Sequence, residues 1–183
     1  MNLLDMILSQ NNGQQVEQLA RQFGIGTNQA QDALSKLVPA LGQGVRNNIS
    51  NQGGLDDLLG AIQRGNHGRY VDDPSALGDP RAVEEGNGIL GHLLGSKDTS
   101  RQLAGAASQS TGLDSSLLKK MLPVIASMVM GSLSKQSSNL GMQPSGRTSS
   151  GGGAFDLLTN FLDADKDGSI LDDLAGMAGK FFR

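Results

Sequence analysis

The chain has no cysteine, no tryptophan and few aromatic side chains, which make up 3% of its 183 residues. Without cysteine it cannot form disulfides, thiol nucleophiles or thiolate metal sites. A core with so few aromatic rings must be aliphatic, which favours closely packed helices over a β-sandwich. Charged residues are also scarce, at 18%, and the net charge of -3 is too mild to predict electrostatic capture of nucleic acid or of an anionic membrane.

Long hydrophobic runs are absent as well. The longest apolar stretch, residues 121–133, is interrupted by Pro123 and Ser127, and it is shorter than the roughly 20 residues of a membrane-spanning helix. We therefore expect no membrane span and interpret this stretch as a buried helix of a soluble bundle. Residues 1–8 lack a basic leader and have too short an apolar run for a signal peptide, which favours a cytoplasmic location.

Apolar residues recur at helical spacing along almost the whole chain, and no segment alternates as a strand does. Helical stripes are predicted over residues 3–8, 16–23, 27–45, 55–62 and 115–133. Thr27 is the expected N-cap of the first long helix, which Pro39 would kink or divide. Asp114 or Ser115 would cap the second. Residues 65–86 are expected to be an irregular connection, with a second helical block starting near Ile89.

The second helical block repeats short motifs of the first. The triplet QLA at residues 18–20 recurs at 102–104, and LSKLVP at 34–39 recurs as LKKMLP at 118–123. Two related helix-turn-helix pieces, about residues 13–50 and 97–134, would explain these matches. Chance similarity between two leucine-rich helices is the alternative interpretation.

The composition changes abruptly after residue 135. Residues 136–153 are rich in serine and glycine, as flexible linkers are. They would separate a helical body, residues 1–135, from a C-terminal helix-loop-helix, residues 154–183. Because that last piece is too small to be stable alone, we expect its apolar face to dock on the body, on a second copy or on another protein.

The C-terminal piece holds the pattern most directly tied to chemistry, DADKDGSI at residues 163–170. In an EF-hand loop, oxygens at positions one, three and five, a glycine at six and a carbonyl at seven surround a calcium ion. Two carboxylates just behind the pattern would close a shortened loop. The predicted metal ligands are therefore Asp163, Asp165, Asp167, Ser169, Asp172 and Asp173.

The loop departs from the EF-hand pattern at position twelve, where Leu174 replaces the bidentate glutamate. For that reason we predict a weak calcium site. The flanking residues have the helical periodicity that the motif needs, but the chain has no second loop to pair with it. The alternative interpretation is a solvated acidic turn, since aspartate and glycine are also common turn residues.

Several of these segments together resemble one known family. They are EGNGILGHLLGSK at residues 85–97, Gly112-Leu113, Leu122-Pro123, NLLD at residues 2–5 and the Asp-rich LDDL near the C-terminus. They resemble the bacterial YidB-like family, domain of unknown function 937, over essentially the whole chain. The resemblance implies an all-helical bundle of homeodomain-like helix-turn-helix units, with no established activity and no catalytic residues.

An enzymatic function finds little support in the residues. His67 and His92 are far apart in sequence, and no Gly-x-Ser-x-Gly elbow or phosphate-binding loop is present. We expect His92 to be structural and His67 to lie in a loop. For DNA binding, Arg46, Arg64 and Arg69 would form a modest basic patch if they converge, but the helix over residues 27–38 carries few cations.

These observations predict an all-α, non-enzymatic interaction or assembly module whose weak calcium-binding loop orders the C-terminal piece. Its partner would be another protein or a second copy, contacted through the apolar C-terminal face, which holds four of the five phenylalanines. The first alternative is a DNA-binding protein that uses a helix-turn-helix unit. The second is a purely structural protein without cation binding.

Overall fold

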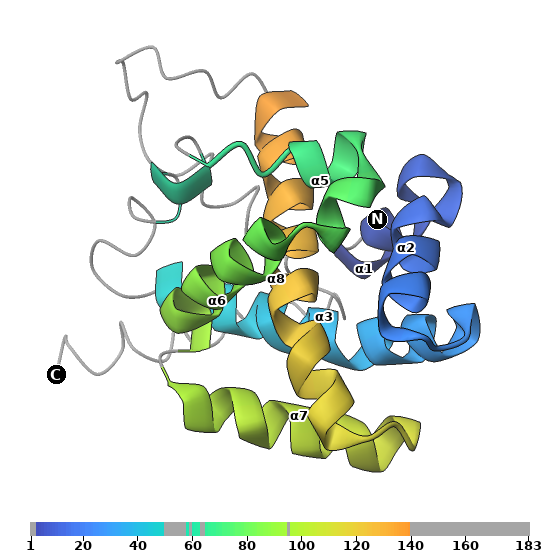
Figure 1. Ribbon diagram of the computed structural model, residues 1–183. Coiled ribbons are helices and arrows are strands. Elements are labelled where there is room, and N and C mark those ends of the chain that lie inside the picture. The colour runs from blue at the N-terminus through green and yellow to red at the C-terminus, as the bar shows by residue number, and fades with distance from the viewer. Residues whose placement is uncertain (1–2, 50–57, 59, 63–64, 95, 140–183) are drawn as a thin grey trace, which may run out of the picture.

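A computed structural model describes residues 3–49, 58, 60–62, 65–94 and 96–139, and none of these residues lies in a strand. The elements, shown in Figure 1, are α1 (Leu3–Ser9), η1 (Gln10–Gly13), α2 (Gln14–Phe23), α3 (Thr27–Ile49), α5 (Arg69–Asp72), η2 (Pro74–Gly78), α6 (Pro80–Leu94), α7 (Lys97–Thr111) and α8 (Ser115–Asn139). The all-α fold class predicted from the sequence is confirmed. The homeodomain-like geometry of its units stays a prediction.

Helix α8 forms the centre of the fold, and in Figure 1 the other helices surround it. It contacts α1, α2, α3, α5, α6 and α7. Among the described residues it is the one helix long and apolar enough to cross a membrane, yet 78% of its most apolar window is buried inside the fold. Residues 121–133 are all buried, as the sequence predicts.

Two buried serines in residues 121–133 of α8 show how the polar side chains of a buried helix are satisfied. The hydroxyl of Ser127 donates a hydrogen bond to the carbonyl oxygen of Ala82 in α6 at 2.7 Å. The hydroxyl of Ser132 donates to Oε1 of Gln10 in η1 at 3.0 Å. Since a buried hydroxyl without a partner would be costly, both bonds also fix where α6 and η1 sit on α8.

Helix α3 buries the predicted stripe, which consists of Ala30, Leu34, Leu37, Val38, Leu41 and Val45. Thr27 is not its N-cap, because Thr27 already lies in the first turn. Gln29 closes this end instead, its Oε1 accepting a hydrogen bond from the N–H of Gly26 at 3.0 Å, which is the backward half of a capping box. Pro39 does not divide the helix, which continues to Ile49.

The expectation of an irregular connection over residues 65–86 is wrong. Pro74 and Pro80 begin η2 and α6 rather than interrupting structure, because proline suits the first position of a helix. The aspartate before each proline closes the turn. The Oδ1 of Asp73 accepts from the N–H of Ser75 at 3.0 Å, and the Oδ1 of Asp79 accepts from the N–H of Arg81 at 2.8 Å.

Each of the two long helices, α3 and α8, follows a shorter helix that ends at a glycine. The helices before them, α2 and α7, end at left-handed glycines, Gly24 with φ 65° and Gly112 with φ 71°. Asp114 caps α8 as expected, its Oδ1 accepting from the N–H groups of Ser116 at 2.8 Å and Leu117 at 3.2 Å. Both halves thus share a helix-glycine-helix order, and the internal duplication stays a prediction. Helix α8 runs into the first residues of the predicted linker, ending at Asn139.

Candidate functional site

A polar cluster joins α5 to α6. The hydroxyl of Tyr70, the only tyrosine in the chain, donates a hydrogen bond to Oε2 of Glu85 at 2.7 Å. Nη2 of Arg69 donates to Oε1 of Glu85 at 2.6 Å and to the Tyr70 hydroxyl at 2.7 Å. The Arg69 guanidinium also lies over the Tyr70 ring, 4.8 Å from its centroid. The carboxylate of Glu85 therefore holds two neighbouring side chains of α5 at once.

His67 completes this cluster and is buried, with 7% of its surface exposed. Its ring stacks on that of Tyr70 with centroids 6.4 Å apart, and its Nδ1 lies 3.4 Å from Oε2 of Glu85. Burial lowers the pKa of His67, and nearby Arg69 lowers it further, against the opposing attraction of Glu85. Burial outweighs the attraction of Glu85, so the pKa of His67 lies below its ordinary value and the ring is neutral near pH 7.

The same segment is tied to the rest of the body. Nε2 of Gln15 donates to the carbonyl oxygen of Tyr70 at 2.9 Å, and Nζ of Lys135 lies 2.6 Å from Oδ1 of Asp72. A Cβ added to Gly131 would lie 2.8 Å from the carbonyl oxygen of His67, so α8 approaches this segment closely. Because Arg69 and Tyr70 already bind the carboxylate of Glu85, the cluster has the character of a structural clamp rather than of a reactive centre.

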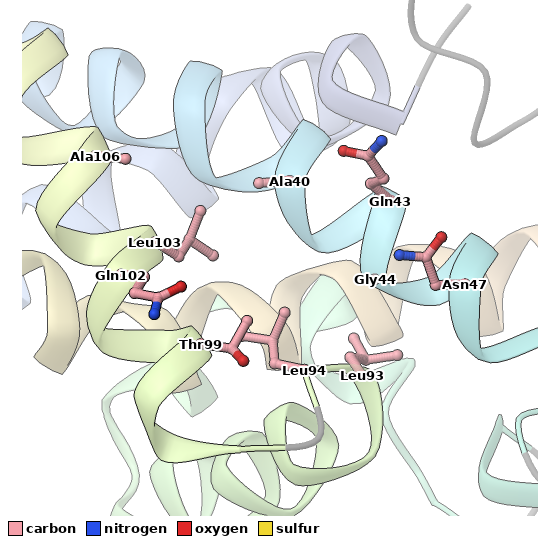
Figure 2. A pocket seen from close by; sticks show the side chains of 10 residues that line it. All are labelled: Ala40, Gln43, Gly44, Asn47, Leu93, Leu94, Thr99, Gln102, Leu103 and Ala106. Atoms are coloured by element: carbon pink, nitrogen blue, oxygen red, sulfur yellow. The ribbon is translucent and has the colours of Figure 1, made fainter.

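Two grooves flank α7, and the first is mainly apolar. This apolar groove has a volume of about 410 Å³ and lies between α3, α6 and α7 (Figure 2). It is lined by Ala40, Gln43, Gly44 and Asn47 of α3, by Leu93 and Leu94 of α6, and by Thr99, Gln102, Leu103 and Ala106 of α7. The residues of α3 and of α7 each follow the spacing of one helix face, and small side chains and amides predominate among them.

The second groove, of about 640 Å³, lies between α6, α7 and the first turns of α8. We call it the basic groove because Lys97, Arg101 and Lys119 line it, and none of the described residues in its lining is acidic. Its remaining lining consists of Asn87, Leu90, Gly91, Ser96, Ser100, Leu122 and Pro123. Arg101 shares its charge with Asp98 on the rim, at 2.5 Å. The groove therefore combines three cations, several hydroxyl and amide groups, and an apolar floor.

The predicted calcium ligands, residues 163–173, lie outside the described residues, so their geometry stays a prediction. Within the part of the chain that the structure describes, no group of three or more histidine, aspartate or glutamate side chains is placed to hold a metal ion. The predicted basic patch stays a prediction, because Arg64 lies outside the described residues. Of its other two members, Arg69 is bound to Glu85. His92 is exposed on α6.

Comparison with known proteins places the body in a family. Residues 5–136 match the family described as a bacterial protein of unknown function, DUF937. The chain belongs to the DUF937 family. The DUF937 region includes the polar cluster and the lining of both grooves, and it ends before residues 154–183, where the resemblance stays a prediction. No curated protein and no solved structure matches the chain.

Sequence reasoning missed both grooves, although one signal for each was present. On α7, Lys97 and Arg101 are four residues apart and so share a helix face. On α3, Ala40, Gly44 and the amides between them also share a face. What the sequence could not give was the partner helix across each groove, because Lys119 and Ala106 are brought there only by tertiary packing.

Proposed function

We propose that this chain is a non-enzymatic assembly module that binds a second copy of itself. In this proposal the apolar groove of one copy receives phenylalanine side chains from the C-terminal piece, residues 154–183, of the other. The observation that carries the proposal is the groove itself: the facing stripes of α3 and α7, in which small side chains and amides predominate, leave a space beside Leu93 and Leu94 of α6 (Figure 2). Location in the cytoplasm remains a prediction from the sequence.

The chemistry of the two surfaces is complementary. The groove walls include Ala40 and Ala106, whose short side chains cannot fill the space between α3 and α7. The C-terminal piece holds four of the five phenylalanines of the chain. Burying one such ring contributes roughly 1.5–3 kcal/mol, and the amides of Gln43 and Gln102 at the rim would hydrogen-bond the incoming backbone.

Calcium would control this assembly through the predicted loop at residues 163–173. Without a cation, the five carboxylates of the loop repel one another. A bound cation cancels that repulsion, fixes the angle between the flanking helices and so presents their apolar faces. Support for this step comes from the sequence alone, and the leucine at position twelve predicts weak affinity.

Sedimentation velocity, with and without millimolar calcium, tests the assembly. Ala106 is exposed in the groove, so Ala106→Arg should leave the fold intact while blocking the entry of an apolar side chain. We expect a concentration-dependent dimer for the wild type and a monomer for Ala106→Arg. Gln31→Arg, which is exposed on the opposite face of α3, is the matched control and should dimerise as the wild type does. A monomeric wild type at all concentrations, or an unaffected Ala106→Arg, would refute assembly through this groove.

Calorimetric titration of calcium, with magnesium for comparison, tests the loop separately. We expect saturable binding to the wild type and its loss in an Asp163→Ala, Asp165→Ala double variant. An Asp32→Ala, Glu84→Ala double variant removes two exposed carboxylates of the body instead and should bind as the wild type does. If the wild type releases no heat and its melting temperature does not move, the loop is an acidic turn and calcium has no part in the assembly.

A further inference from the structure

The net charge of the chain resides entirely in its C-terminal piece. Residues 1–153 carry twelve acidic and twelve basic side chains, whereas residues 154–183 carry six acidic and three basic ones. Between Asp156 and Asp173 the only cation is Lys166. The body and linker together are therefore electrically neutral, and they are joined to an acidic segment.

The basic groove is the matching feature on the body. Lys97 and Lys119 are exposed and form no ion pair with any described residue, while Arg101 shares its charge with Asp98. Three cations face a common space of about 640 Å³, and no acidic side chain is among the described residues that line it. Such an arrangement attracts carboxylates, and the low dielectric of a concave site strengthens the attraction.

We propose that the basic groove binds the acidic stretch at residues 163–173 of the same chain. Its carboxylates would lie against Lys97, Arg101 and Lys119. The apolar residues between those carboxylates, Ile170 and Leu171, would contact Leu90 and Leu122 in the lining of the groove. Unlike the apolar groove, which suits uncharged rings, this site suits a segment that alternates short carboxylates with aliphatic side chains.

The chain length permits this contact. Helix α8 ends at Asn139, and its Pro123 lines the groove sixteen residues earlier, a distance of about 24 Å along the helix axis. The 14 linker residues 140–153 extend to about 46–50 Å at most and average about 19–22 Å as a Gly- and Ser-rich coil. The helix predicted over residues 154–162 adds about 14 Å. The acidic stretch is thus tethered at nearly the optimal distance, which gives an effective concentration in the millimolar range.

Docking of this kind would hold the C-terminal piece on its own body. The carboxylates that enter the groove are also the predicted calcium ligands, so calcium and the groove compete for them. A cation would then release the segment for contact with a second copy. This last step rests on the function proposed above, whereas the docking itself does not.

Because the chain has no native cysteine, a cysteine pair in the full chain tests the docking directly. Ser100→Cys places one thiol in the basic groove and Ser169→Cys places the other in the acidic stretch. Gln31→Cys with Ser169→Cys is the control pair, since residue 31 lies on another face of the body. In chelator, at concentrations where the protein is monomeric, we expect a short bis-maleimide to cross-link the groove pair at least fivefold more than the control pair.

Charge reversal decides whether the groove cations cause the contact. Lys97→Glu with Lys119→Glu should reduce the cross-link of the groove pair to the control level, and high salt should do the same. Adding Asp165→Lys with Asp172→Lys should restore it. Circular dichroism of each variant checks that these exposed changes leave the helices intact.

Three outcomes would overturn the proposal. Equal yields for the two pairs mean that the stretch does not dock in the groove. Cross-links found only between chains mean that the occupant is a second copy. Binding of duplex DNA that is lost in Lys97→Glu, Lys119→Glu, while the cross-link is unchanged, makes the groove a nucleic-acid surface. None of these results depends on calcium or on assembly, so failure of the proposed function would be seen separately.

Discussion

Gly86 of α6 lies directly against the backbone carbonyl of Pro123 in α8. A Cβ added at position 86 would lie 1.9 Å from that oxygen and 2.4 Å from the carbonyl carbon. Only a residue without a side chain allows the two helices to approach so closely. Two residues along the same helix, Gly88 is exposed and would meet nothing within 4 Å.

The two glycines form a matched pair for mutation. Gly86→Ala should lower the free energy of unfolding by about 2 kcal/mol or more, since backbone must shift to admit the methyl group. Gly88→Ala should instead raise it by up to about 1 kcal/mol, because alanine is the better helix former. Urea unfolding followed by circular dichroism measures both. Equal effects at the two positions would mean that α6 and α8 are not packed as described.

His67 should make the protein sensitive to mild acid. Its pKa is lowered in the folded state, so below the ordinary value of 6.5 the unfolded chain binds a proton that the folded chain does not. The free energy of unfolding is therefore not reduced by His67 above pH 6.5, and it decreases progressively as the pH falls from 6.5 toward the folded-state pKa of this histidine. We expect the melting temperature to decrease from pH 7 to pH 5.

Two variants test whether His67 causes this pH dependence of the melting temperature. His67→Phe keeps an aromatic ring against Tyr70 but cannot titrate, so it should lose most of the slope between pH 7 and pH 5. His92→Gln changes an exposed histidine of α6 and should retain the slope. A wild-type slope in His67→Phe would contradict the assignment.

Tyr70 and Glu85 offer a test of the clamp between α5 and α6. Tyr70→Phe removes one hydrogen bond and should cost about 1 kcal/mol. Glu85→Ala removes the acceptor of both Arg69 and Tyr70 and should cost more. A double-mutant cycle on unfolding free energies measures the coupling, and additive costs would show that the two side chains act independently.

Asp114 should stabilise the beginning of α8 in a charge-dependent way. Hydrogen bonds from the side chain and backbone of Ser116, and from the backbone of Leu117, lower the pKa of Asp114. Its contribution is thus present above the unfolded value of 3.8 and is lost as the pH falls through the folded-state pKa. Asp114→Ala should lower the melting temperature at pH 7. Asp114→Asn should lower it much less, because asparagine also caps helices well. Thermal unfolding of the three proteins distinguishes the cases.

The core of the fold was predictable because it consists of periodic apolar stripes. The stripes of α2, α3 and α8 are buried as their 3.6-residue period predicts. Asp114 was predictable as a cap because local side-chain chemistry decides a helix end. The prediction that Thr27 caps α3 was wrong, because the side chain of Gln29, two residues further on, accepts the hydrogen bond at that helix end.

The candidate sites were less predictable because their parts come from distant segments. The segment around His67 has no apolar period, and its burial depends on Glu85, Gln15 and Lys135, each contributed by a different helix. Pro80 lies in the segment expected to be an irregular connection, whereas its fixed φ suits the first turn of α6. Local rules predict where a helix can begin, and only packing determines which faces meet.

The central position of α8 has a consequence for how the chain folds during synthesis. Each of α1, α2, α3, α5, α6 and α7 contacts this helix, yet it is the last described element to be translated. The earlier helices also contact one another, but they cannot complete a common core until α8 has left the ribosome, so the apolar faces that α8 covers stay exposed until then. Truncations that end before α8 should therefore aggregate rather than fold, and the body should appear in a single late step.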